Sequence, residues 1–100
     1  MRKITYYAVF EPTSDGSFGV YWPDLPGCTS YGSTLLQAGE MALEALELHI
    51  SGMEEDGECL PLATLPPFAE VPAGGIVKPV TVYREIIENK FDKYYLQTAV

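Results

Sequence analysis

The stretch Trp22-Pro-Asp-Leu-Pro-Gly-Cys28 constrains the fold of this chain more than any other, because it places two prolines and a glycine close together. Pro23 biases Trp22 toward an extended backbone, so a strand should run up to that residue. In Leu25-Pro26-Gly27, proline fixes φ at about −65° and glycine readily adopts the positive φ that a type II turn requires. The chain is therefore predicted to leave one short strand, turn sharply and enter another.

Periodicity on both sides of this turn predicts a three-stranded antiparallel meander. Ile4 to Phe10 is rich in β-branched and aromatic residues, with Ile4, Tyr6, Ala8 and Phe10 on one face. Asp15-Gly16 is a strong hairpin signal, and Phe18 to Trp22 alternates as a second strand. Cys28 to Tyr31 supplies the third.

The motif Gly32-Ser33-Thr34 marks the change from strand to helix. Thr34 and Gln37 fit a capping box, in which the hydroxyl accepts a backbone N–H and the glutamine reaches back to the first residue of the box. The helix should end at about Gly52, because glycine is favoured just beyond a helix C-terminus. Apolar residues gather on one helix face, and three carboxylates share the other: Glu40, Glu44 and Glu47.

The remainder of the chain predicts a loop, a strand and a short helix. Leu60 to Pro72 contains four prolines and should cross the molecule without regular structure. Ile76 to Arg84 is rich in valine, and Pro79 confines this strand to an edge or to a strand start. A final, short helix is predicted by apolar residues at helical spacing: Ile87, Phe91 and Tyr94.

Together these segments predict one α+β domain over residues 1–84, in the order β-β-β-α-β, with a C-terminal extension over residues 85–100. A chain of 100 residues buries roughly 60–65% of its unfolded surface, which is enough for one core. Because a short sheet has open edges and a small core gains from association, we expect a homo-oligomer.

The distribution of charge favours a basic partner. The net charge is −8, and between Ile4 and Val77 there are eleven carboxylates but no lysine or arginine. Such a surface repels phosphate backbones and attracts basic proteins. The candidate contact residues are Asp24, Glu40, Glu44 and Glu47. The alternative interpretation is that the glutamates form a solvated helix face and that Asp24 caps a turn.

Motifs for catalysis, metals or cofactors are missing from the sequence. His49 is the only histidine and is expected to be a partly buried packing residue. Cys28 and Cys59 have neither zinc-ligand spacing nor a disulfide framework, which indicates a reducing compartment with Cys28 as a small buried residue. There is no nucleophile elbow and no phosphate-binding glycine loop. We predict a non-enzymatic protein with no catalytic residue, metal or cofactor.

A metal-dependent nuclease is the enzymatic alternative. It would need carboxylates that converge from strands and a helix on two metal ions, and the first predicted strand carries none. The aromatic residues of the predicted strands are expected to lie in the core, with Tyr6 and Tyr7 partly exposed. They lack the interleaved basic residues of a nucleic-acid stacking surface. No apolar run approaches the ~20 residues that span a bilayer, and the N-terminus lacks a signal-peptide pattern, so we expect a cytoplasmic protein.

An ordered set of residues now suggests a family. It consists of Val20-Tyr-Trp-Pro-Asp-Leu-Pro-Gly-Cys28, Gly32-x-Thr34, Ala38, Ala42 and Glu44-Ala-Leu46. This pattern closely resembles the N-terminal domain of HicB-like antitoxins, and the resemblance spans roughly residues 6–67. It implies a partial RNase H-like fold with the strand and helix order predicted above.

The resemblance also implies a function. Such antitoxins bind a small basic toxin, a HicA-type mRNA interferase with a double-stranded-RNA-binding-like fold, and cover its catalytic surface. Family members usually continue into a helix-turn-helix or ribbon-helix-helix module, and residues 85–100 are too short for either. We therefore do not expect direct DNA binding by this chain. The alternatives are a reduced RNase H-like metal-dependent nuclease and a transcriptional autorepressor of a toxin–antitoxin operon.

Overall fold

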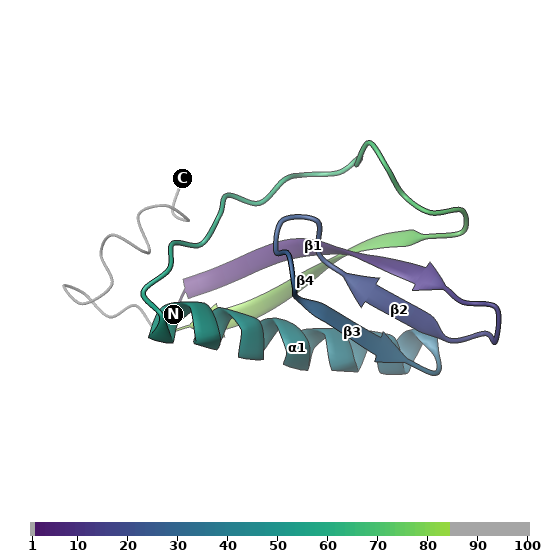
Figure 1. Cartoon of the computed structure of the whole chain (residues 1–100), viewed down its shortest axis with the longest axis horizontal. Helices are drawn as coiled ribbons and strands as arrows, with labels where there is room; N and C mark the ends of the chain where they lie inside the picture. The colour runs from purple at the N-terminus through teal and green to yellow at the C-terminus, as the bar shows by residue number, and fades with distance from the viewer. Residues whose placement is uncertain (1, 85–100) are drawn as a thin grey trace.

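The fold is a four-stranded antiparallel sheet with one long helix packed on one of its faces (Figure 1). The structure is a computed structural model and describes residues 2–84. Its elements are β1 (Arg2–Pro12), β2 (Phe18–Tyr21), β3 (Thr29–Gly32), α1 (Leu35–Glu55) and β4 (Ile76–Arg84). This order confirms the predicted β-β-β-α-β arrangement. The predicted terminal helix lies outside the described residues.

The long strand β1 occupies the centre of the sheet, whose strand order is β3-β2-β1-β4. β2 pairs only with the end of β1, from Val9↔Tyr21 to Pro12↔Phe18. β4 pairs with almost the whole length of β1, from Arg2↔Arg84 to Phe10↔Ile76. β4 is an edge strand, as Pro79 predicted, because proline has no N–H to donate to a further strand.

The inward face of β1 carries the predicted alternating residues into the core. Ile4, Ala8 and Phe10 are buried with Tyr6, and all four belong to the main apolar cluster between sheet and helix. The expectation that Tyr6 is partly exposed was wrong, since its side chain is only 2% exposed. It shares the inward face of the strand, whereas Tyr7 points to the opposite face and is half-buried.

Both predicted turns are confirmed. Gly16 adopts φ +87° in the hairpin between β1 and β2, and Gly27 adopts the same value after Pro26. The Cys28 N–H donates to the Leu25 carbonyl at 3.0 Å, which closes the type II turn. In the hairpin, hydrogen bonds from Ser17 and then from Thr13 lower the pKa of Asp15 to about 2.

The start of α1 follows the predicted cap with one difference. The Thr34 hydroxyl accepts the Gln37 N–H at 3.0 Å, as a capping box requires. The Gln37 side-chain oxygen, however, accepts the N–H of Ser33 at 2.6 Å instead of that of Thr34. The glutamine therefore fixes the residue before the N-cap and stiffens the junction between β3 and the helix.

The end of α1 lies beyond the predicted position. The helix continues through Gly52 to Glu55, and Gly57 with φ +71° ends it. The Glu58 N–H donates to the Met53 carbonyl at 2.9 Å, and the Gly57 N–H donates to Glu54, which together form a Schellman motif. Gly52 stays helical because Met53, one residue later, still packs on the core.

The helix lies close to the sheet because small residues form the contact. Ala38 and Ala42 are fully buried beneath the first half of α1, and Leu46 and Ile50 follow along the same face. Gly32 at the end of β3 makes the tightest approach. A Cβ atom there would lie 2.3 Å from the backbone nitrogen of Ala38, well inside van der Waals contact.

Residues 56–75 connect α1 to β4 without a helix or strand, as predicted for Leu60 to Pro72. Leu60 is fully buried and anchors the start of this loop, whereas Leu62 and Leu65 are exposed. Within residues 2–84, no helix is both long enough and apolar enough to cross a membrane.

Replacement of Gly32 by alanine should be severely destabilising. The added Cβ would collide with helix backbone, which cannot move as a side chain can, so we expect a loss of about 3 kcal/mol or more. Gly19→Ala is the matched control, since a Cβ at Gly19 in β2 meets nothing within 4 Å. Chemical denaturation of both variants measures the difference, and an equal stability of the two would contradict the close approach.

Candidate functional site

The outer face of α1 presents the three glutamates that the sequence singled out. Glu40, Glu44 and Glu47 are all exposed and follow one another at i, i+4 and i+7 along the helix. They point away from the buried face formed by Ala38, Ala42, Leu46 and Ile50. The structure therefore brings these three predicted residues together on one surface, which we call the acidic helix face.

Exposed apolar side chains flank the glutamates on this face. Leu36 is 76% exposed and Leu48 is 69% exposed, with Met41 and Leu43 also accessible. The sequence pattern did not indicate that these apolar residues are exposed beside the glutamates. The number of large apolar residues in α1 could have indicated this exposed surface, because it exceeds what one packed helix face can bury. Apolar anchors beside charged groups are typical of protein interfaces.

Asp24, the fourth predicted contact residue, has an internal role in this structure. It is half-buried, and its carboxylate accepts the Thr64 N–H at 2.7 Å and the Thr64 hydroxyl at 2.8 Å. These bonds tie the turn after β2 to the proline-rich loop, 40 residues further along the chain. Asp24 does not share the acidic helix face, and its contact with a partner stays a prediction.

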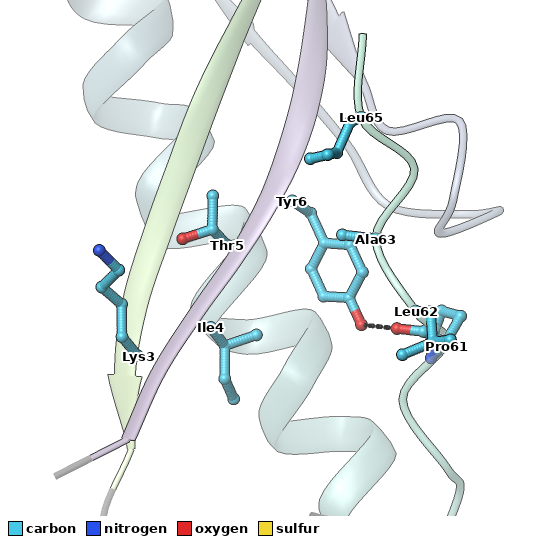
Figure 2. Close-up of a pocket in the computed structure, with 8 residues that line it drawn as sticks. All are labelled: Lys3, Ile4, Thr5, Tyr6, Pro61, Leu62, Ala63 and Leu65. Atoms are coloured by element: carbon cyan, nitrogen blue, oxygen red, sulfur yellow. Dashed lines mark hydrogen bonds between the residues drawn. The ribbon is translucent and has the colours of Figure 1, made fainter. Parts of the chain in front are cut away.

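A second tie holds the same loop against β1, as Figure 2 shows. The Tyr6 hydroxyl donates to the Pro61 carbonyl. Burial of the ring, followed by the negative charge of Asp24, raises the pKa of Tyr6 to about 12. The phenol is therefore neutral at physiological pH and available as a donor to the loop.

The hollow between the loop and β1 is lined by few ionisable side chains. A groove of about 360 Å³ lies between Lys3–Tyr6 of β1 and loop residues that include Pro61 and Leu65 (Figure 2). Its ionisable side chains are Lys3 and Tyr6, and the tyrosine is already hydrogen-bonded. In residues 2–84, no group of three or more histidine, cysteine, aspartate or glutamate side chains is placed to hold a metal ion.

His49 and Cys28 behave as the packing residues that the sequence predicted. His49 is half-buried and lines a second hollow, of about 370 Å³, together with Asp24 and Glu58. Cys28 is buried in the main cluster, and burial raises the pKa of its thiol to about 11. A thiol with so high a pKa is a poor nucleophile at neutral pH.

Comparisons with known proteins point to one family. A family model described as a HicB-like antitoxin of bacterial toxin–antitoxin systems matches residues 6–92. A 14.9 kDa protein from the rep-hol intergenic region of Haemophilus phage HP1 is 48% identical over 58 residues, which are 58% of this chain and 43% of that protein. Antitoxin HicB 1 of Photorhabdus laumondii is 36% identical over 62 residues, which are 62% of this chain and 40% of that protein.

Solved structures agree with these sequence matches. A chain in a HicA3 and HicB3 toxin–antitoxin complex superposes with a TM-score of 0.57 and 29% identity. The match covers 77% of this chain and 95% of that chain. The chain spans less than half of the length of the two curated relatives that it matches.

Removal of the Asp24 carboxylate should loosen the loop. Asp24→Ala removes two hydrogen bonds to Thr64, at an expected cost of about 1–2 kcal/mol, and should speed amide exchange at Thr64. Thr64→Val removes only the hydroxyl bond and should cost less. If Asp24 and Thr64 stabilise the protein through these hydrogen bonds to each other, the double variant should be no less stable than Asp24→Ala. Additive losses in the free energy of unfolding would contradict this interaction.

Alkaline pH should weaken the fold through Tyr6. Because the folded pKa of about 12 lies above the ordinary 10.0, folding favours the protonated phenol. This contribution is complete below pH 10 and is lost as the pH rises through 12. The free energy of unfolding of the wild type should therefore fall across this window, whereas that of Tyr6→Phe should be flatter. The same slope in both proteins would exclude Tyr6 as the cause.

Proposed function

This chain belongs to the HicB-like antitoxin family, and we propose that it binds and neutralises a small basic toxin of the HicA type. The observation that carries the proposal is the acidic helix face, where Glu40, Glu44 and Glu47 lie beside exposed leucines. We propose that this face covers the active surface of the toxin and so stops cleavage of mRNA.

The electrostatic reason lies in the chemistry of the toxin's substrate. A protein that cleaves RNA must hold a phosphate backbone, which requires a positively charged surface. A row of glutamates presents negative charge to that same surface and competes with RNA for it. Complementary charge also accelerates encounter between the two proteins and disfavours acidic partners.

The apolar residues supply the second part of the interaction. Charged pairs at an exposed interface contribute little affinity on their own, since water and salt screen them. Leu36 and Leu48 are the most exposed large apolar residues of α1, and each can fill a pocket on a partner. We propose that these leucines anchor the toxin and that the glutamates orient it.

The solved HicA3 and HicB3 toxin–antitoxin complex supports this assignment, because one of its chains is similar to most of this chain. The function we propose is binding rather than catalysis, and it is exerted in the cytoplasm, where an mRNA interferase meets its substrate. Asp24 holds the loop that joins α1 to β4, and its contact with the toxin stays a separate prediction.

Charge reversal on the acidic helix face should weaken capture of the toxin. The test is co-purification with the small basic protein encoded beside this chain, followed by measurement of the dissociation constant at several salt concentrations. We expect Glu40→Lys combined with Glu44→Lys to weaken binding about tenfold or more and to flatten its salt dependence. The control is Glu70→Lys with Glu58→Lys, which makes the same change in net charge at exposed sites beyond the helix.

Truncation of one exposed leucine separates the apolar contribution from charge. Leu48→Ala should raise the dissociation constant about 5- to 30-fold, whereas Leu62→Ala, an exposed leucine of the loop, should leave it unchanged. Failure of the wild-type chain to bind the neighbouring protein at low salt would refute the proposed function. Equal effects of the helix and loop variants would refute the assignment of the surface.

A further inference from the structure

The first half of β1 has an unpaired edge. β4 covers one side of β1 along almost its whole length, but β2 covers the other side only from Val9 onward. From Lys3 to Ala8, no other strand of the described chain lies on the β2 side, and we call this the open edge of β1. A strand edge of this kind presents N–H and C=O groups that can pair with a further extended chain.

The register identifies which backbone groups lie on the open edge. In the hairpin after β1, the Thr13 N–H donates to the Ser17 carbonyl at 2.9 Å, so Thr13 directs its backbone groups toward the β2 side of the sheet. Backbone direction alternates along a strand, and the pairing of β1 is continuous, without a bulge. The N–H and C=O groups of Lys3, Thr5 and Tyr7 are therefore directed toward the open edge.

Two prolines agree with this assignment. Pro12 lies in register with Phe18, and Pro79 lies in register with Tyr7. Because proline has no N–H, both positions suit pairs that exchange no backbone hydrogen bonds. Tyr7 accordingly turns its backbone groups away from β4. Within residues 2–84, no hydrogen bond from a loop or a side chain reaches the backbone groups of the three edge residues.

A groove of about 360 Å³ runs along the open edge, between β1 and the loop that begins at Pro61 (Figure 2). The loop lies on the β2 side of β1, because Thr64 is bound by Asp24 in the turn after β2. The buried Tyr6 ring extends from β1 toward the loop, and its hydroxyl donates to the Pro61 carbonyl. These two ties hold the loop beside the edge without any backbone bond to it. The groove is therefore a preorganised space.

The groove differs in charge from the rest of the molecule. Lys3 lines it and is exposed, and no carboxylate of the described chain is among the side chains that line it. By contrast, the net charge is −8, and no lysine or arginine occurs between Ile4 and Val77. A residue paired across from Lys3 shares its face of the sheet, where opposite charges stabilise a cross-strand pair. The open edge thus favours an extended chain with an acidic residue at that position.

We propose that the groove binds an extended, acidic segment of a partner protein, which adds a strand to the open edge of β1. The segment runs antiparallel to β1, in the position that a longer β2 would occupy. One of its residues exchanges two backbone hydrogen bonds with Thr5, and an acidic residue two positions later pairs with Lys3. The residues between these positions are small and apolar, because they face the buried ring of Tyr6.

Shape and charge favour such a segment over other occupants. The loop stands across the groove from β1, so a second copy cannot bring its own β1 edge to this one without a collision between the two loops. A basic segment would place its charge beside Lys3 and is attracted to the acidic helix face instead. Because the open edge belongs to the sheet and the glutamates lie on the outer side of α1, this inference does not rest on the proposed function (Figure 1).

The first measurement is amide hydrogen exchange in the full chain, followed by NMR at low concentration without a partner. The Thr5 and Tyr7 amides should exchange about tenfold or more faster than the Tyr6 and Ala8 amides, which are directed toward β4. Equal protection of the two sets would overturn the proposal, because the edge would then be filled by the chain itself or by a second copy.

The second measurement titrates the labelled full chain with a peptide of the proposed pattern, acetyl-Val-Ala-Thr-Val-Glu-amide. In the proposed register its central threonine lies opposite Thr5 and its glutamate lies opposite Lys3. The peptide should produce saturable shifts of the Lys3 and Thr5 amide signals and should slow exchange of the Thr5 amide. A titration without saturable shifts at these residues up to ~5 mM peptide would overturn the proposal.

Two methylated peptides test whether backbone hydrogen bonds carry the interaction. Methylation of the threonine nitrogen removes the donor to Thr5 and should weaken binding about tenfold or more. Methylation of the preceding alanine nitrogen should weaken binding far less, since that N–H points away from β1. Equal losses from the two methyl groups would contradict the addition of a strand.

Charge variants test the position of the acidic residue. Lys3→Glu should weaken binding of the peptide about fivefold, and a peptide that ends in lysine should bind this variant better than it binds the wild type. Lys78→Glu is the matched control, because it makes the same change at an exposed site of β4, beyond the other side of β1. Equal effects of the two variants would refute the proposed register.

The last control separates this site from toxin binding. The variant with Glu40→Lys and Glu44→Lys alters only the acidic helix face and should still bind the peptide. Circular dichroism establishes that each variant is folded before it is titrated. Loss of peptide binding in this helix variant would overturn the assignment to the open edge, whereas loss of toxin binding alone would leave the assignment supported.

Discussion

The close approach of β3 to the start of α1 determines how the rest of the molecule is arranged. Gly32 touches the helix backbone at Ala38, where no larger residue fits. The Thr34 cap then begins the helix only two residues later, which leaves α1 little freedom in where it starts or how it lies. With Ala38 and Ala42 packed against the sheet, the opposite side of the helix must face solvent. The position of the three glutamates follows from this contact.

The position of β4 creates a second requirement. α1 begins beside β3, but β4 must pair with β1 on the far side of the sheet. Residues 56–75 make this crossing without regular structure, so side chains have to hold them. Leu60 is buried, the Tyr6 hydroxyl binds the Pro61 carbonyl, and Asp24 binds Thr64. Residues from β1 and from the turn after β2 therefore position a loop that is remote in sequence.

Local signals explain which features could be predicted from the sequence. The type II turn at Pro26-Gly27, the Thr34 cap and the edge position of β4 each depend on residues a few positions apart. The end of α1 was mispredicted because glycine is tolerated inside a helix when packing continues past it, as it does at Met53. The tie between Asp24 and Thr64 joins residues 40 positions apart and has no local signature.

In the candidate site, too, some features have a local sequence signal and others depend on long-range packing. Periodicity alone aligned Glu40, Glu44 and Glu47, since helical geometry fixes which residues share a face. It did not reveal that Leu36 and Leu48 remain exposed, because that depends on how much of the helix the sheet covers. A two-layer fold with one helix has two outer faces. Here the exposed glutamates of α1 lie on one of them, and Tyr31 and Tyr83 of the sheet lie exposed on the other, so the two outer faces differ in charge.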